Sequence, residues 1–355
     1  MTQSRDAYFR RVMDGSDRSI SASALRTAAA CIEPIYAGMM RLRNGLYDAG
    51  ISPIHRLGRP TISVGNITTG GTGKTPVVRW LVKCLSDRRP CVLLRGYKST
   101  KAGISDEQAM LEADGIPVIA DRDRLRGAHT ALKQHPEITN FVLDDGMQHR
   151  RAARDFEMVL IHAREPFGSG RVFPRGMLRE PLGGLRRADA VVVTHADEVD
   201  PDELAKVSEA IRKHNGDVEV FHADHVIENL RSAEGESAPI QSLVGQRYFA
   251  FCGIGSPESF FWRLGTVGGT CAGTRAFADH YDYQERDLRS VFDEAKAVGA
   301  QRVVTTEKDW VKVSRFVAEV SIPIWRAELV VRFWRGEEER LLAAIRKRLG
   351  GQGDQ

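Results

Sequence analysis

The run from Val64 to Pro76, VGNITTGGTGKTP, combines glycines with a lysine and a threonine at the spacing of a phosphate-binding loop. A short apolar segment precedes it and a helix-like segment follows, so Lys74 and Thr75 would open that helix. Glycines let successive N–H groups point at one anion, and the helix N-terminus adds partial positive charge. The lysine reaches nucleotide phosphates, and the threonine hydroxyl can bind Mg²⁺. The sequence therefore predicts a nucleotide-binding P-loop made of Thr68, Thr69, Gly70, Gly71, Thr72, Gly73, Lys74 and Thr75.

Position 68 departs from the strict P-loop pattern G-x-x-x-x-G-K-[ST], because Thr68 replaces the first glycine. A glycine-rich turn that binds nothing is the alternative interpretation. The apolar segment before the loop, the helix after it and the Lys-Thr pair together favour nucleotide binding.

Asp144 and Asp145 end the apolar run FVLDDG at 141–146. In P-loop proteins such a strand lies beside the loop strand, and its terminal carboxylate reaches Mg²⁺ directly or through water. Adjacent acids at a strand end also begin solvated loops, but the upstream P-loop favours the metal site. Taken alone, His149 is more typical of an ordinary loop histidine. Donors that could meet phosphates follow directly: Gln148, His149, Arg150, Arg151 and Arg154.

Two other classes of P-loop protein are disfavoured because their signatures are missing. A GTPase needs an Asn/Thr-Lys-x-Asp motif, and the nearest string, TEKD at 306–309, has the wrong spacing. ATPases with the deviant Walker loop carry a lysine directly before the glycine pair, where this chain has Thr69. Kinase chemistry remains, and transfer to an alcohol needs a group that accepts the hydroxyl proton. The candidates are Asp106, Glu107 and the string DHYDY at 279–283, which sequence spacing alone cannot bring together.

The composition is that of a folded chain of about two domains: 355 residues, 42% apolar and 28% charged. The net charge of +4 is too mild for general nucleic-acid binding, so no nucleic-acid partner is expected. Six arginines lie between positions 164 and 187, which predicts either a patch for an anionic ligand or a solvated loop. Five cysteines without C-x-x-C spacing fit reduced thiols of a cytosolic protein. No signal peptide or membrane-spanning segment is expected.

Short β-branched runs alternate with helical segments, which predicts parallel strands covered by helices on both faces. Strands are expected at 61–64, 91–95, 117–120, 141–143, 157–161, 190–194, 248–252, 275–277 and 302–305, with later helices at 258–264 and 285–298. The predicted fold class is α/β, a P-loop NTPase-like parallel-sheet domain with a second, smaller α/β domain. The expected boundaries are 1–230 for the P-loop domain, 231–246 for a polar linker, 247–330 for the smaller domain and 331–355 for a C-terminal helix.

Apolar residues recur at a helical period from Leu25 to Leu46, which predicts a helix that Pro34 kinks or divides. The pattern alone favours packing of this helix against its own domain. The alternative is a helix that lies on a membrane surface, with its arginines at the headgroups.

Motifs spread over residues 30 to 330 make the chain resemble the tetraacyldisaccharide 4'-kinases, which are the lipid A 4'-kinases of Gram-negative-type envelopes. The matching strings are SVGN through KTP at 63–76, RGY at 95–97, SDE at 105–107, DDGMQH at 144–149, RD at 154–155, FPRG at 173–176, LREP at 178–181, RADA at 187–190, FCGIG at 251–255, ADHY at 278–281 and TTEKD at 305–309. This ordered series is far more specific than the P-loop, whose Thr68 also matches the family's own loop. Residues 1–20 lie outside the resemblance.

The resemblance implies an ATP- and Mg²⁺-dependent enzyme of lipid A biosynthesis. Its substrate would be the 4'-hydroxyl of a tetraacylated glucosamine disaccharide 1-phosphate. The fold would be a P-loop domain with a smaller domain that closes over the nucleotide, joined by a thin two-stranded linker. The implied catalytic residues are Asp106 as the base, His280 as its partner, Lys74 and Asp145. The implied metal ligands are Thr75, Asp144 and Glu180, and the implied substrate or phosphate contacts are Tyr97, Arg124, His149 and Arg179.

Two positions depart from the family pattern, because Gln108 and Ala278 stand where prolines are common. Both changes affect the rigidity of loops and leave the assignments of residues standing.

An acylated disaccharide lipid as substrate implies a peripheral enzyme at the cytoplasmic face of the inner membrane. Four acyl chains do not leave a bilayer, because each CH₂ moved into water costs about 0.8 kcal/mol. The resemblance therefore favours the membrane interpretation of the helix at 25–46 and gives the arginine-rich segment an anionic lipid partner. The alternative function is a nucleotide-gated, membrane-associated ATPase or regulator without a small-molecule acceptor, and a kinase of a soluble metabolite is a third. The sequence does not set the oligomeric state.

Overall fold

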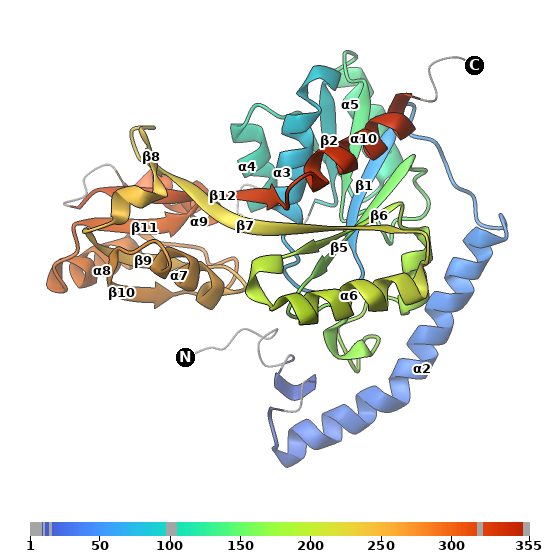
Figure 1. Ribbon diagram of the computed structural model, residues 1–355, viewed down its shortest axis with the longest axis horizontal. Helices are drawn as coiled ribbons and strands as arrows, with labels where there is room; N and C mark the ends of the chain where they lie inside the picture. The colour runs from blue at the N-terminus through green and yellow to red at the C-terminus, as the bar shows by residue number, and fades with distance from the viewer. Residues whose placement is uncertain (1–8, 10, 14–15, 97–104, 318–321, 351–355) are drawn as a thin grey trace. The chain divides into compact units, whose positions relative to one another are not determined.

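The computed structural model describes residues 9, 11–13, 16–96, 105–317 and 322–350, which divide into two units. The larger unit comprises residues 1–96, 116–224 and 331–355, and the smaller unit comprises residues 97–115 and 225–330. Each unit is built on parallel strands with helices packed beside them, which confirms the predicted α/β class (Figure 1).

The larger unit contains a parallel sheet with the strand order β7-β6-β5-β1-β4-β2-β3. Its strands are β1 (Thr61–Asn66), β2 (Pro90–Leu94), β3 (Val118–Ala120), β4 (Asn140–Asp144), β5 (Phe156–His162), β6 (Ala190–Thr194) and the first part of β7 (Glu219–Ser232). Every residue of β1, β2 and β6 is buried, as expected for strands covered on both faces. Because β1 pairs with β4 and Val64 lies opposite Asp144, the C-terminal ends of these two strands are neighbours.

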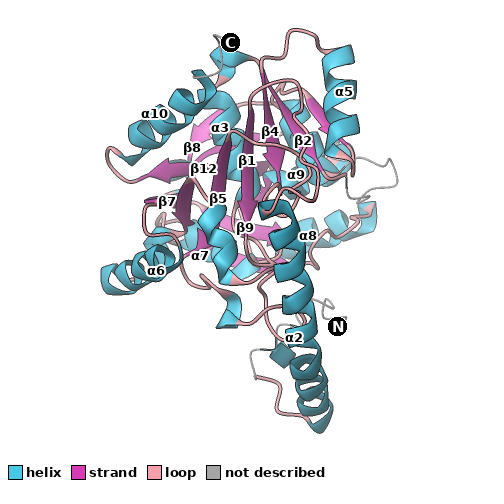
Figure 2. Ribbon diagram, turned by 90° about the vertical axis from the view of Figure 1, so that its right-hand side faces the viewer, coloured by secondary structure: helices cyan, strands magenta, loops and turns pink. Residues whose placement is uncertain are grey.

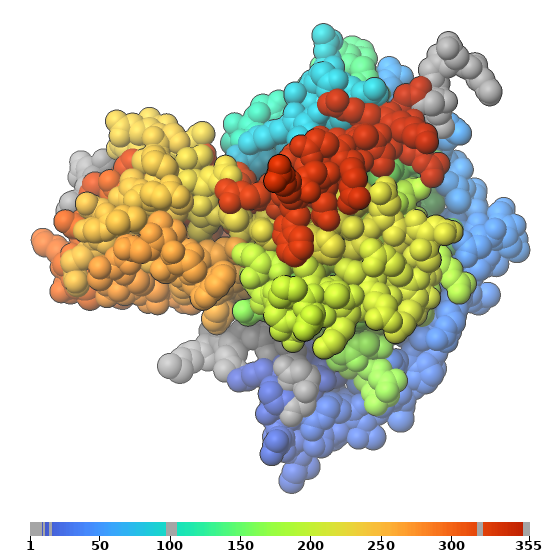
Figure 3. Space-filling view, in the orientation of Figure 1, coloured from blue at the N-terminus to red at the C-terminus, as the bar shows by residue number. Residues whose placement is uncertain are grey.

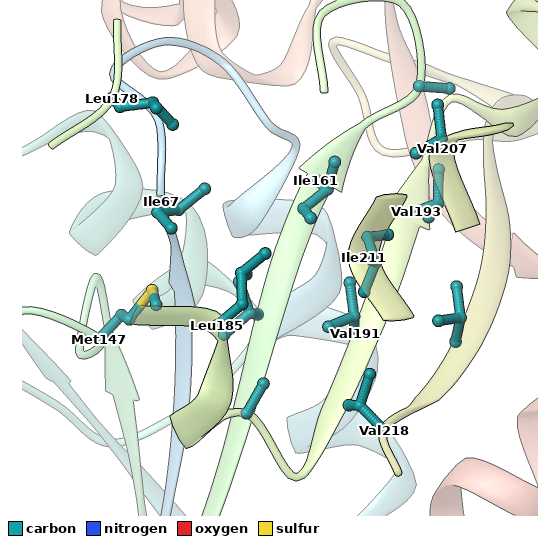
Figure 4. Packing of buried hydrophobic residues seen from close by; sticks show 14 of the residues in the cluster. Ile67, Met147, Ile161, Leu178, Leu185, Val191, Val193, Val207, Ile211 and Val218 are labelled. Carbon is teal, nitrogen blue, oxygen red and sulfur yellow. The ribbon is translucent and has the colours of Figure 1, made fainter. Parts of the chain in front are cut away.

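Five helices of the larger unit are α2 (Ile20–Asp48), α3 (Lys74–Cys84), α5 (Arg124–Gln134), α6 (Pro201–His214) and α10 (Glu337–Gly350). Val207 and Ile211 of α6 pack onto Ile161, Val191 and Val193 of the sheet (Figure 4). Helix α10 lies at the surface of this unit (Figure 3) and is tied to α3, because the Trp80 indole N–H donates to the Glu338 carboxylate at 2.7 Å.

The smaller unit contains parallel strands in the order β10-β9-β11-β12. Its strands are β9 (Arg247–Cys252), β10 (Thr270–Ala276), β11 (Arg302–Thr306) and most of β12 (Ile324–Phe333), and its helices are α4 (Asp106–Ala113), α7 (Pro257–Gly265), α8 (Glu285–Ala297) and α9 (Glu307–Val313). Phe251 and Val303 of the sheet pack with Val291 and Phe292 of α8. Helix α4 packs against α9, although it belongs to the chain segment between β2 and β3.

The observed limits of the units differ from the predicted boundaries. Residues 97–115 belong to the smaller unit, and the C-terminal helix belongs to the larger one. The expected linker at 231–246 carries β8 (Ser237–Pro239), and its residues Ile240 and Leu243 are buried in the core of the smaller unit. Two neighbouring strands of the sheet, β7 and β12, run from one unit into the other. They correspond to the two-stranded linker that the resemblance implies.

Helix α2 is one helix of 29 residues that runs through Pro34. The prediction that Pro34 divides this helix is therefore wrong. Pro34 is exposed, and there water can reach the carbonyl that the missing proline N–H leaves without its helical partner. The N-terminal half of α2 extends away from the rest of the larger unit (Figure 2). Within the described ranges, no helix combines the length and the apolar character needed to cross a membrane.

Candidate active site

The predicted P-loop connects β1 to α3 and leaves its tip accessible. Gly73 forms the N-cap of α3 with φ +72°, and Gly70 has φ +125°, which are backbone conformations that favour glycine. Gly70 and Gly71 are exposed, whereas Lys74 and Thr75 are half-buried. An anion in solvent can therefore reach the N-terminus of α3 and the amides of the loop.

Four contacts hold the shape of this loop. The Asn66 side-chain amide donates to the Thr68 carbonyl at 2.8 Å, and its oxygen accepts from Lys74 Nζ at 3.2 Å. The Thr69 N–H donates to the Met177 carbonyl at 2.7 Å. The Thr194 hydroxyl, at the end of β6, donates to the Thr72 carbonyl at 3.0 Å. These contacts come from three different strand ends or loops and anchor the loop at the edge of the sheet.

Asp145 lies among cations at the end of β4. Lys74 Nζ is 3.6 Å from its Oδ1, and Arg179 donates to both of its oxygens at 2.7 and 2.9 Å. Burial alone would raise the pKa of Asp145, but the charges of Lys74 and Arg179 outweigh burial and lower it. Asp145 therefore stays ionised and holds both cations beside the loop.

Thr75 and Asp144 provide oxygen donors of the kind that Mg²⁺ prefers. Thr75 is in the first turn of α3, and Asp144 ends the strand that pairs with β1. A hydroxyl and a carboxylate at the shared C-terminal edge of paired strands match the donor set of a P-loop metal site. The chemistry of these two residues therefore fits a magnesium ion bound to nucleotide phosphates.

Glu180, the third implied metal ligand, is occupied by protein donors instead. Its side chain is fully buried and accepts hydrogen bonds from Asn44 of α2, Gln148 and Arg187 at 2.8 to 3.0 Å. A carboxylate with both oxygens engaged and no access to solvent has no lone pair directed at a metal in this conformation. In this structure Glu180 ties α2 to the segment that follows β5, and its implied role as a metal ligand stays a prediction.

The residues implied as substrate or phosphate contacts differ in their surroundings. Arg179 lies beside the P-loop through Asp145, as described above. Arg124 is only 2% exposed and donates to the carbonyls of Asp121 and Asp144, so it supports the end of β4 rather than facing a ligand. Burial and the charge of Arg124 lower the pKa of His149 to about 4, so His149 is neutral at pH 7 and offers no cation to phosphate. Tyr97 lies outside the described residues.

The smaller unit brings Asp106 and His280 together, although 174 positions separate them. His280 Nδ1 lies 3.1 Å from Asp106 Oδ2. Asp106 begins α4, whose N-cap is the Ser105 hydroxyl, and it is fully buried. The His280 side chain, in the loop after β10, is 44% exposed. Of the two groups, only the imidazole is open to a molecule in solvent.

The protonation preferences of this pair point the same way. Burial would raise the pKa of Asp106, but its hydrogen bonds to His280 and Lys312 lower it overall. The bond to Asp106 raises the pKa of His280 above its usual value, against burial and the nearby Lys308 charge. A buried carboxylate with a lowered pKa is a poor proton acceptor, whereas an exposed imidazole with a raised pKa is a good one. In exposure and protonation, His280 suits the role of proton acceptor and Asp106 that of the group that orients it, whereas the resemblance implies Asp106 as the base.

A separate set of potential metal ligands occurs in the larger unit, where His162, His195 and Glu198 each place a ligand atom within 4.8 Å of the others. The two imidazole rings stack in parallel, with centroids 4.2 Å apart and planes 11° from each other. Nearly parallel rings direct their lone pairs in parallel, so both cannot point at one ion without a ring rotation. His195 Nδ1 instead lies 2.9 Å from Glu198. We assign no metal to this group.

Known proteins resemble this chain over nearly its whole length. The family model described as tetraacyldisaccharide-1-P 4'-kinase matches residues 25–350. The tetraacyldisaccharide 4'-kinase of Halothermothrix orenii is 33% identical over 347 residues, with 89% of this chain and 90% of the relative covered. The enzyme of that name from Geobacter sulfurreducens is 34% identical over 348 residues, with 92% and 94% covered.

A solved structure is also similar to this chain in its fold. The "apo" form of LpxK from Aquifex aeolicus in complex with ATP is 30% identical, covers 92% of this chain and 99% of its own, and superposes with a TM-score of 0.71. The chain belongs to the tetraacyldisaccharide 4'-kinase family. Because the match to the family spans both units, it includes the P-loop of the larger unit and the Asp106–His280 pair of the smaller one.

Membership of the tetraacyldisaccharide 4'-kinase family confirms the fold class and the resemblance that the motifs indicated. Sequence reasoning missed Lys308 and Lys312, which lie on α9 near the Asp106–His280 pair. Lys308 belongs to the TTEKD string, and Lys312 follows it four residues later on the same face of the helix. A lysine pair at this spacing was the available signal, but nothing in the sequence shows that α4 packs against it.

Proposed function

We propose that this protein transfers the γ-phosphate of ATP to the 4'-hydroxyl of a tetraacylated glucosamine disaccharide 1-phosphate. The observation that carries the proposal is the contact between Asp106 Oδ2 and His280 Nδ1 at 3.1 Å. P-loops occur in many classes of protein. A kinase that phosphorylates an alcohol also requires a group that accepts the hydroxyl proton. Membership of the tetraacyldisaccharide 4'-kinase family supplies the acceptor class.

The proposed chemistry assigns each step to a named group. Lys74 and the loop amides hold the β- and γ-phosphates of ATP, and Arg179 and Asp145 hold Lys74 and the loop environment in place. Mg²⁺, held by Thr75 and Asp144, would neutralise charge on the phosphates. His280 Nδ1–H donates to Asp106, which leaves Nε2 as the acceptor for the 4'-hydroxyl proton. The 4'-oxygen then forms a bond to the γ-phosphorus as the bond to the β–γ bridging oxygen breaks, and ADP leaves.

We further propose that helix α2 lies on the membrane surface that holds the lipid substrate. Ile32, Ile35, Met39 and Leu42 form a stripe along α2, and each is between 51% and 66% exposed. A stripe of this size on a helix that buries Ala29 and Ala37 on its other side is typical of an interfacial helix. The apolar side would insert at the headgroup boundary of the cytoplasmic face of the inner membrane.

A basic groove beside α2 supports the same orientation. The groove has a volume of about 1050 Å³ and is lined by α2 and the segment 170–187. Arg41, Arg171 and Arg186 line it, and none of them has an ion-pair partner within the part of the chain that the structure describes. Unpaired arginines next to an apolar stripe suit lipid phosphates, which attract basic side chains at a membrane surface.

A phosphate-transfer assay tests the proposed reaction. Protein, γ-labelled ATP, Mg²⁺ and the acylated disaccharide 1-phosphate in micelles should yield a labelled lipid. The His280→Gln variant should lose transfer while it still binds ATP, and His129→Gln, which alters an exposed histidine of α5, should behave as the wild type. ATP hydrolysis that does not depend on the disaccharide would instead favour the nucleotide-gated regulator.

A vesicle-binding assay tests the membrane surface separately. The double variant Ile35→Glu, Met39→Glu should remove co-sedimentation with vesicles that contain phosphatidylglycerol. The double variant Ser23→Glu, Thr27→Glu, which adds the same two charges at exposed positions of α2, is the matched control. Equal loss in both variants would argue that charge, and not the apolar stripe, governs binding.

A further inference from the structure

Lys312 is a buried lysine that the proposed reaction does not yet use. It lies on α9, its side chain is 7% exposed, and its Nζ lies 2.7 Å from Asp106 Oδ2. Removing a lysine charge from water costs free energy unless a partner compensates, so buried lysines are rare. The partner here is the fully buried carboxylate that also contacts His280.

The two donors His280 and Lys312 share one oxygen of Asp106. His280 Nδ1 and Lys312 Nζ both approach Oδ2, at 3.1 and 2.7 Å, while Oδ1 is buried without a hydrogen-bond partner among the described residues. Lys312 therefore approaches the carboxylate from the interior, and the partly exposed imidazole approaches it from the side open to solvent. Lys312 therefore affects the protonation of His280 through the carboxylate that both of them contact.

We infer that Lys312 is a positioning residue that holds Asp106 in place and limits how strongly Asp106 attracts a proton to His280. The inference rests on the proposed role of His280 as the proton acceptor. An ionised Asp106 alone favours the imidazolium, which cannot accept the substrate proton. The Lys312 charge offsets that of Asp106, so His280 stays sufficiently neutral to act near pH 7.

Other charged groups also face His280 and are part of the balance. Asp279 and Glu107 favour the imidazolium, and Lys308 opposes it. Lys308 Nζ lies 3.4 Å from His280 Nε2 and 3.1 Å from Asp279 Oδ1, so its charge is already paired with Asp279. Lys312 differs from Lys308 because it contacts the carboxylate rather than the imidazole. Replacing Lys312 therefore changes the protonation of His280 without removing a group next to His280 Nε2.

The test compares Lys312→Met with the wild type by the pH dependence of kcat. Removing the charge should move the acidic limb of the profile upward by about one pH unit, because the uncompensated carboxylate strengthens proton binding by His280. At pH 7 the rate should then fall about tenfold, with recovery near pH 9 and little change in the KM for ATP. Lys312→Arg should keep the wild-type limb. Lys296→Met, at an exposed lysine of α8, is the matched control.

A direct titration of His280 keeps this inference separate from the proposed reaction. The ring signal of His280, assigned by its loss in His280→Gln, should titrate at higher pH in Lys312→Met whether or not phosphate is transferred. In an Asp106→Asn background, Lys312→Met should no longer raise that midpoint, because no carboxylate remains to be unmasked. A uniform loss of rate at every pH with an unchanged midpoint would overturn the inference and leave Lys312 a structural residue. If Lys312→Met does not fold, the Lys312→Gln variant is titrated in the same way.

Discussion

Replacing Asp106 with asparagine and His280 with glutamine, one at a time, separates the orienting group from the proton acceptor. Asparagine keeps an oxygen that can accept from His280 Nδ1 but removes the negative charge 3.1 Å away. Opposite unit charges about 4 Å apart attract by about 4 kcal/mol at an effective dielectric constant of 20. The His280 side chain is 44% exposed, so solvent screening reduces this attraction to about 1 kcal/mol.

The sign of the expected change follows from the direction of the pKa shift. Asp106 raises the pKa of His280, so its removal lets the imidazole lose its proton at lower pH. The acidic limb of the kcat profile should therefore move down by about one pH unit in Asp106→Asn, with a lower plateau because the imidazole is less basic and less firmly oriented. In His280→Gln the limb should disappear, and the rate should fall by roughly 10²- to 10⁴-fold at every pH.

Steady-state transfer rates from pH 5.5 to 9, with ATP affinity measured by calorimetry, check both outcomes. Asp106→Asn also leaves Lys312 buried without its partner, which costs about 3–5 kcal/mol of folding free energy. A urea unfolding curve must therefore show that this variant is folded at the assay temperature. An acidic limb that persists in His280→Gln would refute the reasoning, because a group other than His280 would then titrate in the reaction.

Three further outcomes are expected from the larger unit. Lys74→Met should weaken ATP binding by at least tenfold in calorimetry, and an unchanged Kd would mean that the loop lysine does not contact phosphate. Glu180→Gln should lower the free energy of unfolding by about 3 kcal/mol, because Arg187 loses its buried partner, while the Mg²⁺ dependence of ATP binding stays as in the wild type; a weaker Mg²⁺ dependence would support Glu180 as a metal ligand. His149 should titrate near pH 4 by NMR, and because its folded pKa lies below the unfolded value, stability should fall as the pH drops from about 6.5 toward 4; a midpoint near 6.5 would contradict the burial of this ring.

The parallel strands could be predicted because β1, β2 and β6 are unbroken apolar runs buried on both faces. Strand β7 was missed because its later residues alternate between buried and partly exposed, and its polar positions resemble a loop. The P-loop was predictable because its residues are consecutive and their spacing reflects a local backbone shape.

The contacts that set the roles of acidic residues were not predictable. Glu180 meets donors from Asn44, Gln148 and Arg187, and no local pattern indicates that these segments converge. Likewise, the burial of Asp106, which decides its role, depends on the packing of α4 against α9. Long-range packing of this kind leaves no trace in the spacing of the residues that take part.

The position of α4 in the chain has a consequence for biosynthesis. Asp106 leaves the ribosome early, but its partners His280 and Lys312 are made only after another 174 and 206 residues, respectively. Until then, Asp106 and the start of α4 lack the residues that they pack against. Closing so long a loop is also slow. The strand ends and loops that hold the P-loop extend only to Thr194, so a nucleotide grip can precede the acid–imidazole contact during translation. Folding intermediates of this polypeptide should accordingly bind ATP before they acquire the ability to use it.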